Sequence, residues 1–445
     1  MEENEHRIDP VDRWIIDPLN RFISNSTTSG IVLFSSAALA LILSNSPWSD
    51  EFQQIWKHKV SIGYDAYIIS KDLHHWINDG LMSLFFFVVG LELKREIIAG
   101  ELSDLKKAAL PIAAAIGGML VPALIYLLFN RSGDTADGWG IPMATDIAFA
   151  LGVLYLLGDK VPLSLKIFLT VLAIADDIGA VLVIAFFYTS DINVISLFTG
   201  AAFMAVLIVA NVIGVRSTLF YGIVGIAGLW LAFIMSGVHA TIAGVLAAFT
   251  IPARVKVSAN YYSQKLEQLL VLFKSAEVNT LPTVSKEQFK ILSKIENFSE
   301  QALTPLQRLE HTMHPFVAFL IMPIFALSNA GVELSSNFLT QIQSPVSLGI
   351  FFGLLAGKVI GVVGVVYLML RLRWAVLPQG VNMLHIWGTG FVAAIGFTMS
   401  LFISGLAFRQ EEYAVQAKLG VLAASITASV IGYCIIRIAN KKNVG

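Results

Sequence analysis

The chain has 445 residues, of which 56% are hydrophobic and 14% charged, and its formal net charge at pH 7 is −1. Its mean hydropathy is +0.73, and its charged share is far below the roughly 25% of an ordinary soluble domain. This composition argues for a membrane protein. No Lys/Arg-rich block points to a nucleic-acid partner, and a single cysteine excludes a disulfide within the chain.

Apolar runs recur along almost the whole chain, and each is close to the ~20 residues with which an α-helix crosses a hydrocarbon core of ~30 Å. They predict an all-α polytopic membrane protein with about twelve transmembrane helices. The expected spans lie near 29–46, 75–97, 108–129, 140–158, 162–188, 193–214, 218–236, 238–252, 315–333, 346–370, 386–408 and 415–438.

The placement of Lys and Arg predicts the orientation of these spans. Every even-numbered span is followed by basic residues, such as Lys106 and Lys107 after the second and Arg254 after the eighth, whereas odd-numbered spans are followed by fewer cations and more acids. By the positive-inside rule, both termini are therefore expected on the cytoplasmic side. The N-terminal segment fits either a helix on the membrane surface or a plain cytoplasmic lead-in.

Two polar segments lie outside the expected spans. Residues 47–74 contain two short strand-like runs, Lys59–Gly63 and Ala66–Ser70, on either side of a turn, and predict an external hairpin. Residues 254–308 are charged, have helical stretches and predict a cytoplasmic insertion between two membrane regions. The expected division of the chain is a cytoplasmic segment 1–28, a first membrane region 29–253, the insertion 254–308, a second membrane region 309–438 and a cytoplasmic tail 439–445.

The clearest chemical signal is AIADDIGA at 173–180, which places Asp176 and Asp177 in the middle of the fifth expected span. A charge at mid-membrane costs at least about 2.5 to 3.5 kcal/mol on insertion scales, so such residues need a function or a partner. Adjacent helical residues point about 100° apart, and two close carboxyl groups titrate as a coupled pair. Because hard cations prefer oxygen ligands, the pair can hold protons or Na⁺ in competition. A helix-to-helix hydrogen-bonding pair is the alternative.

A second signal is ATDIAFALG at 144–152, where Thr145 and Asp146 follow Pro142 and two glycines. Glycine and proline weaken a helix, so a break near these residues would expose backbone groups to a polar cavity. The eleventh expected span offers a counterpart in Gly388, Gly390 and Gly396, with Thr398 and Ser400 adjacent. Close helix packing is an equally good explanation of the glycines.

A third signal is Lys358, in GKVIG at 357–361, which lies too deep in the tenth expected span to reach the membrane surface. Such a lysine needs an acid, and either Asp176 or Asp146 would neutralise it. It is then either a proton carrier or one half of a structural salt bridge.

Several titratable residues lie closer to the expected membrane surfaces. Glu92, Arg95 and Glu96, in GLELKRE at 90–96, form either a cytoplasmic funnel or an ordinary ion cluster at a helix end. Other candidates for pH sensing are His239, Glu310 and His311, although a packing role for His239 is the alternative. Asp79, in WINDGLM, is another intramembrane acid, either structural or part of an ion path.

These motifs together resemble those of NhaA-type Na⁺/H⁺ antiporters, and they run in order over almost the whole chain. They are WINDGLM, GLELKRE, AIGGMLVPAL at 115–124, ATDIAFALG, AIADDIGA, GVHATIAG at 237–244, LEHTMHP at 309–315, GKVIG and GFTMSLFI at 396–403. The resemblance implies twelve transmembrane helices, inverted repeats, and two broken helices that cross. Paired interrupted spans point to a transporter site, a rule for which this family is itself one of the type examples.

The resemblance also implies function and partners. It implies a bacterial inner-membrane antiporter that extrudes Na⁺ or Li⁺ in exchange for two protons. Asp177 would be the principal Na⁺ ligand, with Asp176 and Thr145 beside it, while Asp146 and Lys358 would balance the dipoles of the broken helices. Glu92, Arg95, Glu96, Glu310 and His311 match the family's pH-regulatory region, and the 47–74 segment matches the hairpin through which members form homodimers. The 254–308 insertion is longer than the family pattern.

Rival functions remain at this point. A carboxylate transporter or Na⁺ symporter would need a larger substrate pocket with Arg or Asn ligands, and a retinal pump would use about seven spans. A membrane sensor would use the insertion as its output. We expect neither an enzyme nor a cofactor, because no phosphate-binding loop, metal-spaced His/Cys cluster or nucleophile elbow occurs.

Overall fold

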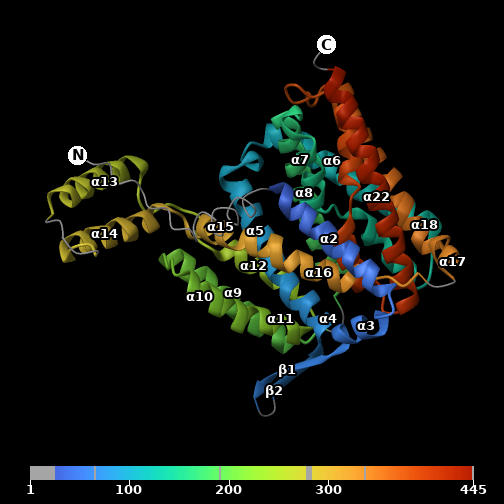
Figure 1. The fold of residues 1–445 in the computed structure, drawn as a ribbon, viewed down its shortest axis with the longest axis horizontal. Coiled ribbons are helices and arrows are strands. Elements are labelled where there is room, and N and C mark those ends of the chain that lie inside the picture. The colour runs from blue at the N-terminus through green and yellow to red at the C-terminus, as the bar shows by residue number, and fades with distance from the viewer. Residues whose placement is uncertain (1–25, 65–66, 190–191, 277–282, 335–336, 443–445) are drawn as a thin grey trace.

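The computed structural model describes the chain except residues 1–25, 65–66, 190–191, 277–282, 335–336 and 443–445. It is a helical bundle with one small two-stranded sheet (Figure 1). Its helices are α2 (Ser26–Ser44), α3 (Ser49–Lys57), α4 (Leu73–His75), α5 (Met82–Ala99), α6 (Leu105–Phe129), α7 (Ile147–Leu156), α8 (Leu163–Phe187), α9 (Val194–Ile213), α10 (Thr218–Ile223), α11 (Leu231–Ser236), α12 (Ala240–Thr250), α13 (Ala259–Ser275), α14 (Lys286–Ala302), α15 (Pro305–Phe316), α16 (Met322–Asn329), α17 (Phe338–Ile342), α18 (Pro345–Phe352), α19 (Lys358–Arg371), α20 (Met383–Ala393), α21 (Phe397–Ala407) and α22 (Glu411–Lys442), and its strands are β1 (Lys59–Tyr64) and β2 (Tyr67–Asp72).

Short 3₁₀ and π segments join several of these helices into longer ones. The π segments are Trp76–Leu81, Val224–Trp230, Val317–Ile321 and Gly353–Gly357, and the 3₁₀ segments are Glu101–Ser103, Ala136–Met143 and Gly158–Lys160.

Eight helices in the described part of the chain are long and apolar enough to cross a membrane, and ten if each of two bent pairs counts as a span. This confirms the predicted all-α polytopic membrane protein. The count of twelve stays a prediction. The second and the eighth expected spans are not among the ten. The second, around Met82–Ala99, carries four charged residues near its end, and the eighth, Ala240–Thr250, has only 11 residues.

The ninth expected span begins earlier than predicted. The helical segment that holds it runs from Pro305 to Asn329 rather than from residue 315. Thr304 starts it with a capping box, in which its hydroxyl accepts from Gln307 N and the Gln307 side chain accepts from Thr304 N, and Pro305 fills the first helical position. Glu310 and His311 therefore lie on a helix and not in a connecting loop.

Close glycine contacts bring the central helices together. A Cβ atom at Gly361 of α19 would overlap the carbonyl oxygen of Gly117 of α6, so these two backbones can touch only because both residues are glycine. A Cβ atom at Gly244 of α12 would likewise overlap the backbone of Ser83 in α5. The bundle core is thus built partly on direct backbone approach.

The 47–74 segment contains a helix and a hairpin. α3 covers its first part, and β1 pairs with β2 in antiparallel register from Lys59 opposite Asp72 to Tyr64 opposite Tyr67. Two residues of the predicted turn, Gly63 and Tyr64, belong to β1 instead, and the third, Asp65, lies outside the described residues. The hairpin projects from one end of the bundle, which we call the hairpin end (Figure 1).

The 254–308 segment forms a second projection. α13 and α14 pack against each other, with the Tyr262 ring stacked on Phe298 at 5.5 Å between centroids and its hydroxyl 2.8 Å from Ser299 Oγ. Figure 1 shows this pair standing away from the bundle. We call the side of the bundle that carries it the insertion end.

Candidate ion-binding site

The first helix break lies at Ala144, Thr145 and Asp146, between the 3₁₀ segment and α7. The backbone is extended at Ala144 (φ −80°, ψ 143°) and at Asp146 (φ −84°, ψ 98°). Asp146 then caps α7, because its Oδ1 accepts a hydrogen bond of 3.0 Å from Phe149 N. The break falls where the sequence predicted it.

The second break lies between α20 and α21, whose axes differ by 43°. It faces the first break directly. Asp146 N donates to Ile395 O at 2.7 Å, and Thr145 Oγ1 lies 2.7 Å from Ala393 O. Each break thus satisfies backbone groups that the other exposes, which is the condition for non-helical backbone at membrane depth.

Asp146 joins the two broken helices through Thr398 of α21. Its Oδ2 accepts a hydrogen bond of 3.1 Å from Thr398 N and a second from Thr398 Oγ1. One carboxyl group therefore caps α7 and reaches the first turn of α21, where both helix dipoles have their positive ends. Phe397 N, also in that turn, donates to Ser425 Oγ of α22 at 3.2 Å.

Lys358 pairs with Asp176 in the centre of the bundle. The Lys358 Nζ atom lies 2.7 Å from Asp176 Oδ2, and both side chains are 0% exposed. Lys358 Nζ also donates to Met143 O, at the carboxyl end of the 3₁₀ segment. Its positive charge therefore lies where that segment presents unpaired carbonyl groups. Of the two acids that the sequence left open as its partner, the structure selects Asp176.

Thr145 places its hydroxyl between two acceptors. Its Oγ1 is 2.7 Å from Asp176 Oδ2 and 2.7 Å from Ala393 O. A hydroxyl group has one proton to donate, so both contacts are full hydrogen bonds only when Asp176 carries a proton of its own. The contact thus depends on the protonation of Asp176.

Two carboxylate oxygens at this site lack a hydrogen-bond partner. They are Asp176 Oδ1 and Asp177 Oδ1, both inaccessible to solvent, and Asp177 forms no ion pair within the described residues. Buried polar atoms are normally paired, and an unpaired one costs free energy. Two carboxylate oxygens and a hydroxyl are the donor set that a hard cation prefers. The residues present therefore have the donor chemistry of a hard-cation site.

A second charged cluster lies at the insertion end, and the structure brings most of the predicted pH-regulatory residues into it. Arg95 Nη1 lies 2.8 Å from Glu310 Oε1, and its Nη2 lies 2.8 Å from Glu96 Oε1. The Glu310 and Glu96 side chains are only 11% and 13% exposed. Glu92 Oε1 is 3.9 Å from His314 Nε2. The ion pairs therefore join α5 to α15.

Two predicted residues lie elsewhere. Asp79 forms an ion pair with Lys71 of β2 at 3.0 Å, so it connects the hairpin to the bundle. His239 precedes α12, and its Nε2 donates to Tyr188 O at 2.6 Å. Neither belongs to the Asp176–Lys358 site or to the Arg95 cluster.

Sequence reasoning missed two features. Ser425 supports the second break, and nothing in its local sequence distinguishes it from other serines in apolar helices. Asp72, His74 and His75 lie together at the end of β2, with one possible ligand atom from each within 4.8 Å of the others. The sequence DLHH at 72–75 carries that signal, although its spacing matches no common metal motif.

The apolar helix bundle defines a polytopic membrane protein. The buried Lys–Asp pair beside two facing helix breaks is an intramembrane charged site, and such sites mark ion and proton pathways. Comparison with known proteins identifies the family. Residues 20–436 match the family model described as Na⁺/H⁺ antiporter 1. The chain belongs to this family.

Curated relatives cover nearly the whole chain. It is 50% identical to the Na⁺/H⁺ antiporter NhaA of Oleidesulfovibrio alaskensis over 430 residues, which are 96% of this chain and 95% of the relative. It is 46% identical to Na⁺/H⁺ antiporter NhaA 1 of Saccharophagus degradans, over 95% of this chain and 93% of the relative. It is also 46% identical to NhaA of Acidithiobacillus ferrooxidans, over 96% of this chain and 99% of the relative.

Proposed function

We propose that this protein exchanges Na⁺ or Li⁺ for protons across the bacterial inner membrane, and that Asp176 and Asp177 hold both kinds of ion in turn. The observation that carries the proposal is the pair of unpartnered carboxylate oxygens on these aspartates, buried beside the helix crossing. The names of the curated relatives support the same activity.

The chemistry is competition for one set of oxygens. Na⁺ binds to Asp177, to Asp176 and to the Thr145 hydroxyl. One proton binds to the same pair of carboxyl groups when Na⁺ is released, because two close carboxylates do not both stay ionised in a buried site without a compensating charge. Because the site never binds Na⁺ and protons at the same time, transport of one ion in one direction is coupled to transport of the other in the opposite direction.

Lys358 supplies the compensating charge in the proton-loaded state. When Na⁺ takes Asp176 as a ligand, the Lys358 ammonium loses its partner and releases a proton, which makes it a second proton carrier. The alternative is that Lys358 only holds Asp176 in place. With two proton-binding groups per Na⁺, exchange moves one net charge inward and gains about 2.3 kcal/mol per 100 mV of membrane potential.

Asp146 acts on the site through the backbone. Because it caps α7 and bonds to Thr398 in α21, it holds the two breaks in register. We propose that the breaks open to one side of the membrane at a time, which gives alternating access to Asp176 and Asp177. The cluster of Arg95 with Glu96 and Glu310 would adjust this motion to pH.

Orientation and assembly complete the proposal. Both termini and the insertion end lie in the cytoplasm, and the hairpin end faces outward, as the positive-inside rule predicts. Two copies associate through the hairpin, whose strands β1 and β2 pair only with each other within the described residues. Deletion of residues 59–72 should convert the dimer to a monomer in light scattering of detergent-solubilised protein; an unchanged mass would locate the interface elsewhere.

The transport proposal is tested in proteoliposomes with an acidic lumen. External Na⁺ or Li⁺, but not K⁺, should make the lumen alkaline, and Asp177→Asn should abolish the response. Asp134→Asn, an exposed acid that accepts from Gln410, is the matched control and should transport normally. Full exchange by the Asp177→Asn protein would refute the aspartate mechanism. No response by the unaltered protein from neutral to alkaline pH would refute antiport itself and favour a symporter or a sensor.

A further inference from the structure

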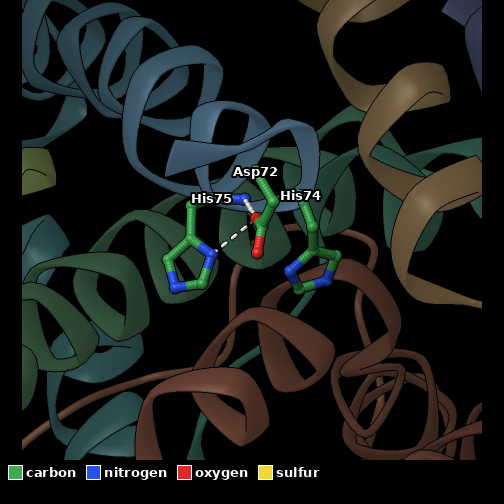
Figure 2. Close-up of side chains that lie close together, drawn as sticks. All are labelled: Asp72, His74 and His75. Carbon is green, nitrogen blue, oxygen red and sulfur yellow. Dashed lines mark hydrogen bonds and ion pairs between the residues drawn. The ribbon is translucent and has the colours of Figure 1, made fainter. Parts of the chain in front are cut away.

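At the hairpin end, a side-chain group outside the proposed transport site has the composition of a metal site. Asp72 is the last residue of β2, and His74 and His75 follow it in α4. His75 Nδ1 lies 2.6 Å from Asp72 Oδ1. Figure 2 shows that both rings turn a nitrogen toward the Asp72 carboxylate, and one ligand atom from each residue lies within 4.8 Å of the other two.

The local backbone fixes this grouping. Asp72 Oδ1 accepts from His75 N at 2.8 Å, which holds the carboxylate over the first turn of α4. The side chains are partly accessible, with 32% of Asp72 and 58% of His75 exposed. An ion can therefore reach the group from solvent without any opening of the bundle.

The surroundings of His74 orient it as a metal ligand. Asn329, at the end of α16, donates through its Nδ2 to Asn78 Oδ1 and to Phe325 O, both at 3.0 Å. Its Oδ1 is therefore the acceptor that faces His74 Nε2 at 3.1 Å, so Nε2 carries the ring proton and Nδ1 carries the lone pair. In the structure this lone pair accepts from Asn78 Nδ2 at 3.3 Å, so a bound ion would replace that hydrogen bond. Histidines that bind a metal through one ring nitrogen usually donate the N–H of the other ring nitrogen to a fixed oxygen, as His74 does here.

We propose that Asp72, His74 and His75 bind a divalent transition-metal ion, Zn²⁺ above all. Two imidazole nitrogens and one carboxylate oxygen suit Zn²⁺, Ni²⁺ or Cu²⁺, whereas Mg²⁺ and Ca²⁺ prefer oxygen ligands throughout. Zn²⁺ would draw the three ligand atoms in to about 2.0–2.2 Å from itself and take water as its fourth ligand.

Neighbouring charges set the strength of the site. Lys71 is engaged by Asp79 at 3.0 Å, so its charge is largely balanced. Lys418 of α22 acts on His74 electrostatically and opposes a bound cation. The bound ion would join the end of β2 to α4 and, through the His74 contact with Asn329, to α16. It would therefore fix the base of the hairpin against the bundle.

The test is calorimetric titration of the chelator-treated, tag-free protein with ZnCl₂, and with MgCl₂ as a second arm. We expect one saturable Zn²⁺ site per chain and no heat with Mg²⁺. Asp72→Asn, which keeps a capping side chain, and His75→Ala should each weaken Zn²⁺ binding at least tenfold. His58→Ala is the matched control, because His58 is an exposed histidine in the same segment whose Nδ1 contacts a backbone oxygen, Gln54 O. Lys418→Gln should tighten binding.

Each contrary result is decisive. Equal binding by the unaltered protein and by Asp72→Asn and His75→Ala, or equal loss in the His58→Ala control, would mean an adventitious ion only. Weaker binding in Lys418→Gln would contradict the assigned position of the ion. Melting curves of each variant without metal separate loss of the site from loss of the fold. The measurement does not involve transport, so its failure leaves the proposed antiport untouched.

Discussion

Lys358 Nζ lies 2.7 Å from Asp176 Oδ2, and neither side chain is exposed to solvent. A buried ion pair is a weak source of stability in itself, because both charges lose their hydration, but removal of one partner leaves an uncompensated charge. Removal of one partner is therefore expected to cost more stability than the ion pair itself contributes.

Lys358→Met should lower the stability of the detergent-solubilised protein by about 3–5 kcal/mol when Asp176 stays ionised. The double variant Lys358→Met/Asp176→Asn should recover most of this loss, because no buried charge is left without a partner. Thermal melting of the two single variants and the double variant measures the coupling. Additive losses would show that the two groups do not interact as the distance implies.

Asp146→Ala should be less stable than Asp146→Asn by about 1 kcal/mol. Asparagine still caps α7 through its side-chain oxygen, whereas alanine leaves the N–H group of Phe149 without that acceptor. The N–H group of Thr398 loses its carboxylate acceptor in both variants, so it does not contribute to the difference. The comparison uses melting temperatures of both variants in the same detergent. Equal melting temperatures of the two variants would mean that the hydrogen bond from the side-chain oxygen does not contribute to stability and that only the charge of Asp146 matters.

Gly361→Ala should destabilise the bundle by about 1–3 kcal/mol, the usual cost of forcing extra atoms into a packed interface. The added Cβ would overlap the backbone oxygen of Gly117, and neither helix can move aside without disturbing the Lys358 site one turn away. Gly364→Ala in the same helix is the control, since nothing lies within 4 Å of its Cβ position. A similar cost for both variants would trace the effect to helix propensity and not to packing.

Arg95→Gln should move the pH profile of exchange toward higher pH. Loss of the guanidinium leaves Glu310, whose side chain is nearly buried, without its cation, so this carboxyl group binds a proton more readily and the same charge state needs a more alkaline medium. Initial rates in proteoliposomes over a pH series measure the shift. Arg308→Gln is the control, because Arg308 and Glu300 form an ion pair with both side chains about half exposed (49% and 47%). A shift of equal size in both proteins, or none in Arg95→Gln, would exclude a regulatory role for this cluster.

The features that could be predicted from the sequence are those with a local cause. Apolar runs and rare charges in them identified the membrane class and marked Asp176, Asp177, Asp146 and Lys358 as residues in need of partners. Pro142 and its neighbouring glycines predicted the break at Thr145. Helix ends were less accurate: the ninth span began ten residues early in the structure, because a capping box at Thr304 starts a polar first turn that hydropathy does not detect.

Contacts between distant segments could not be predicted. The sequence offered both Asp146 and Asp176 as partners of Lys358, and only helix packing decides between them. Asp146 meets Thr398 across 252 residues, and Ser425 supports the same break although its local sequence does not distinguish it. The sequence by itself determined which residues need a charge partner or a hydrogen-bond partner, since the cost of a buried charge or a broken helix depends on residue type and local hydropathy. The tertiary structure decided which groups serve as these partners, since hydrogen bonds and ion pairs act over about 3 Å and depend on how the helices cross.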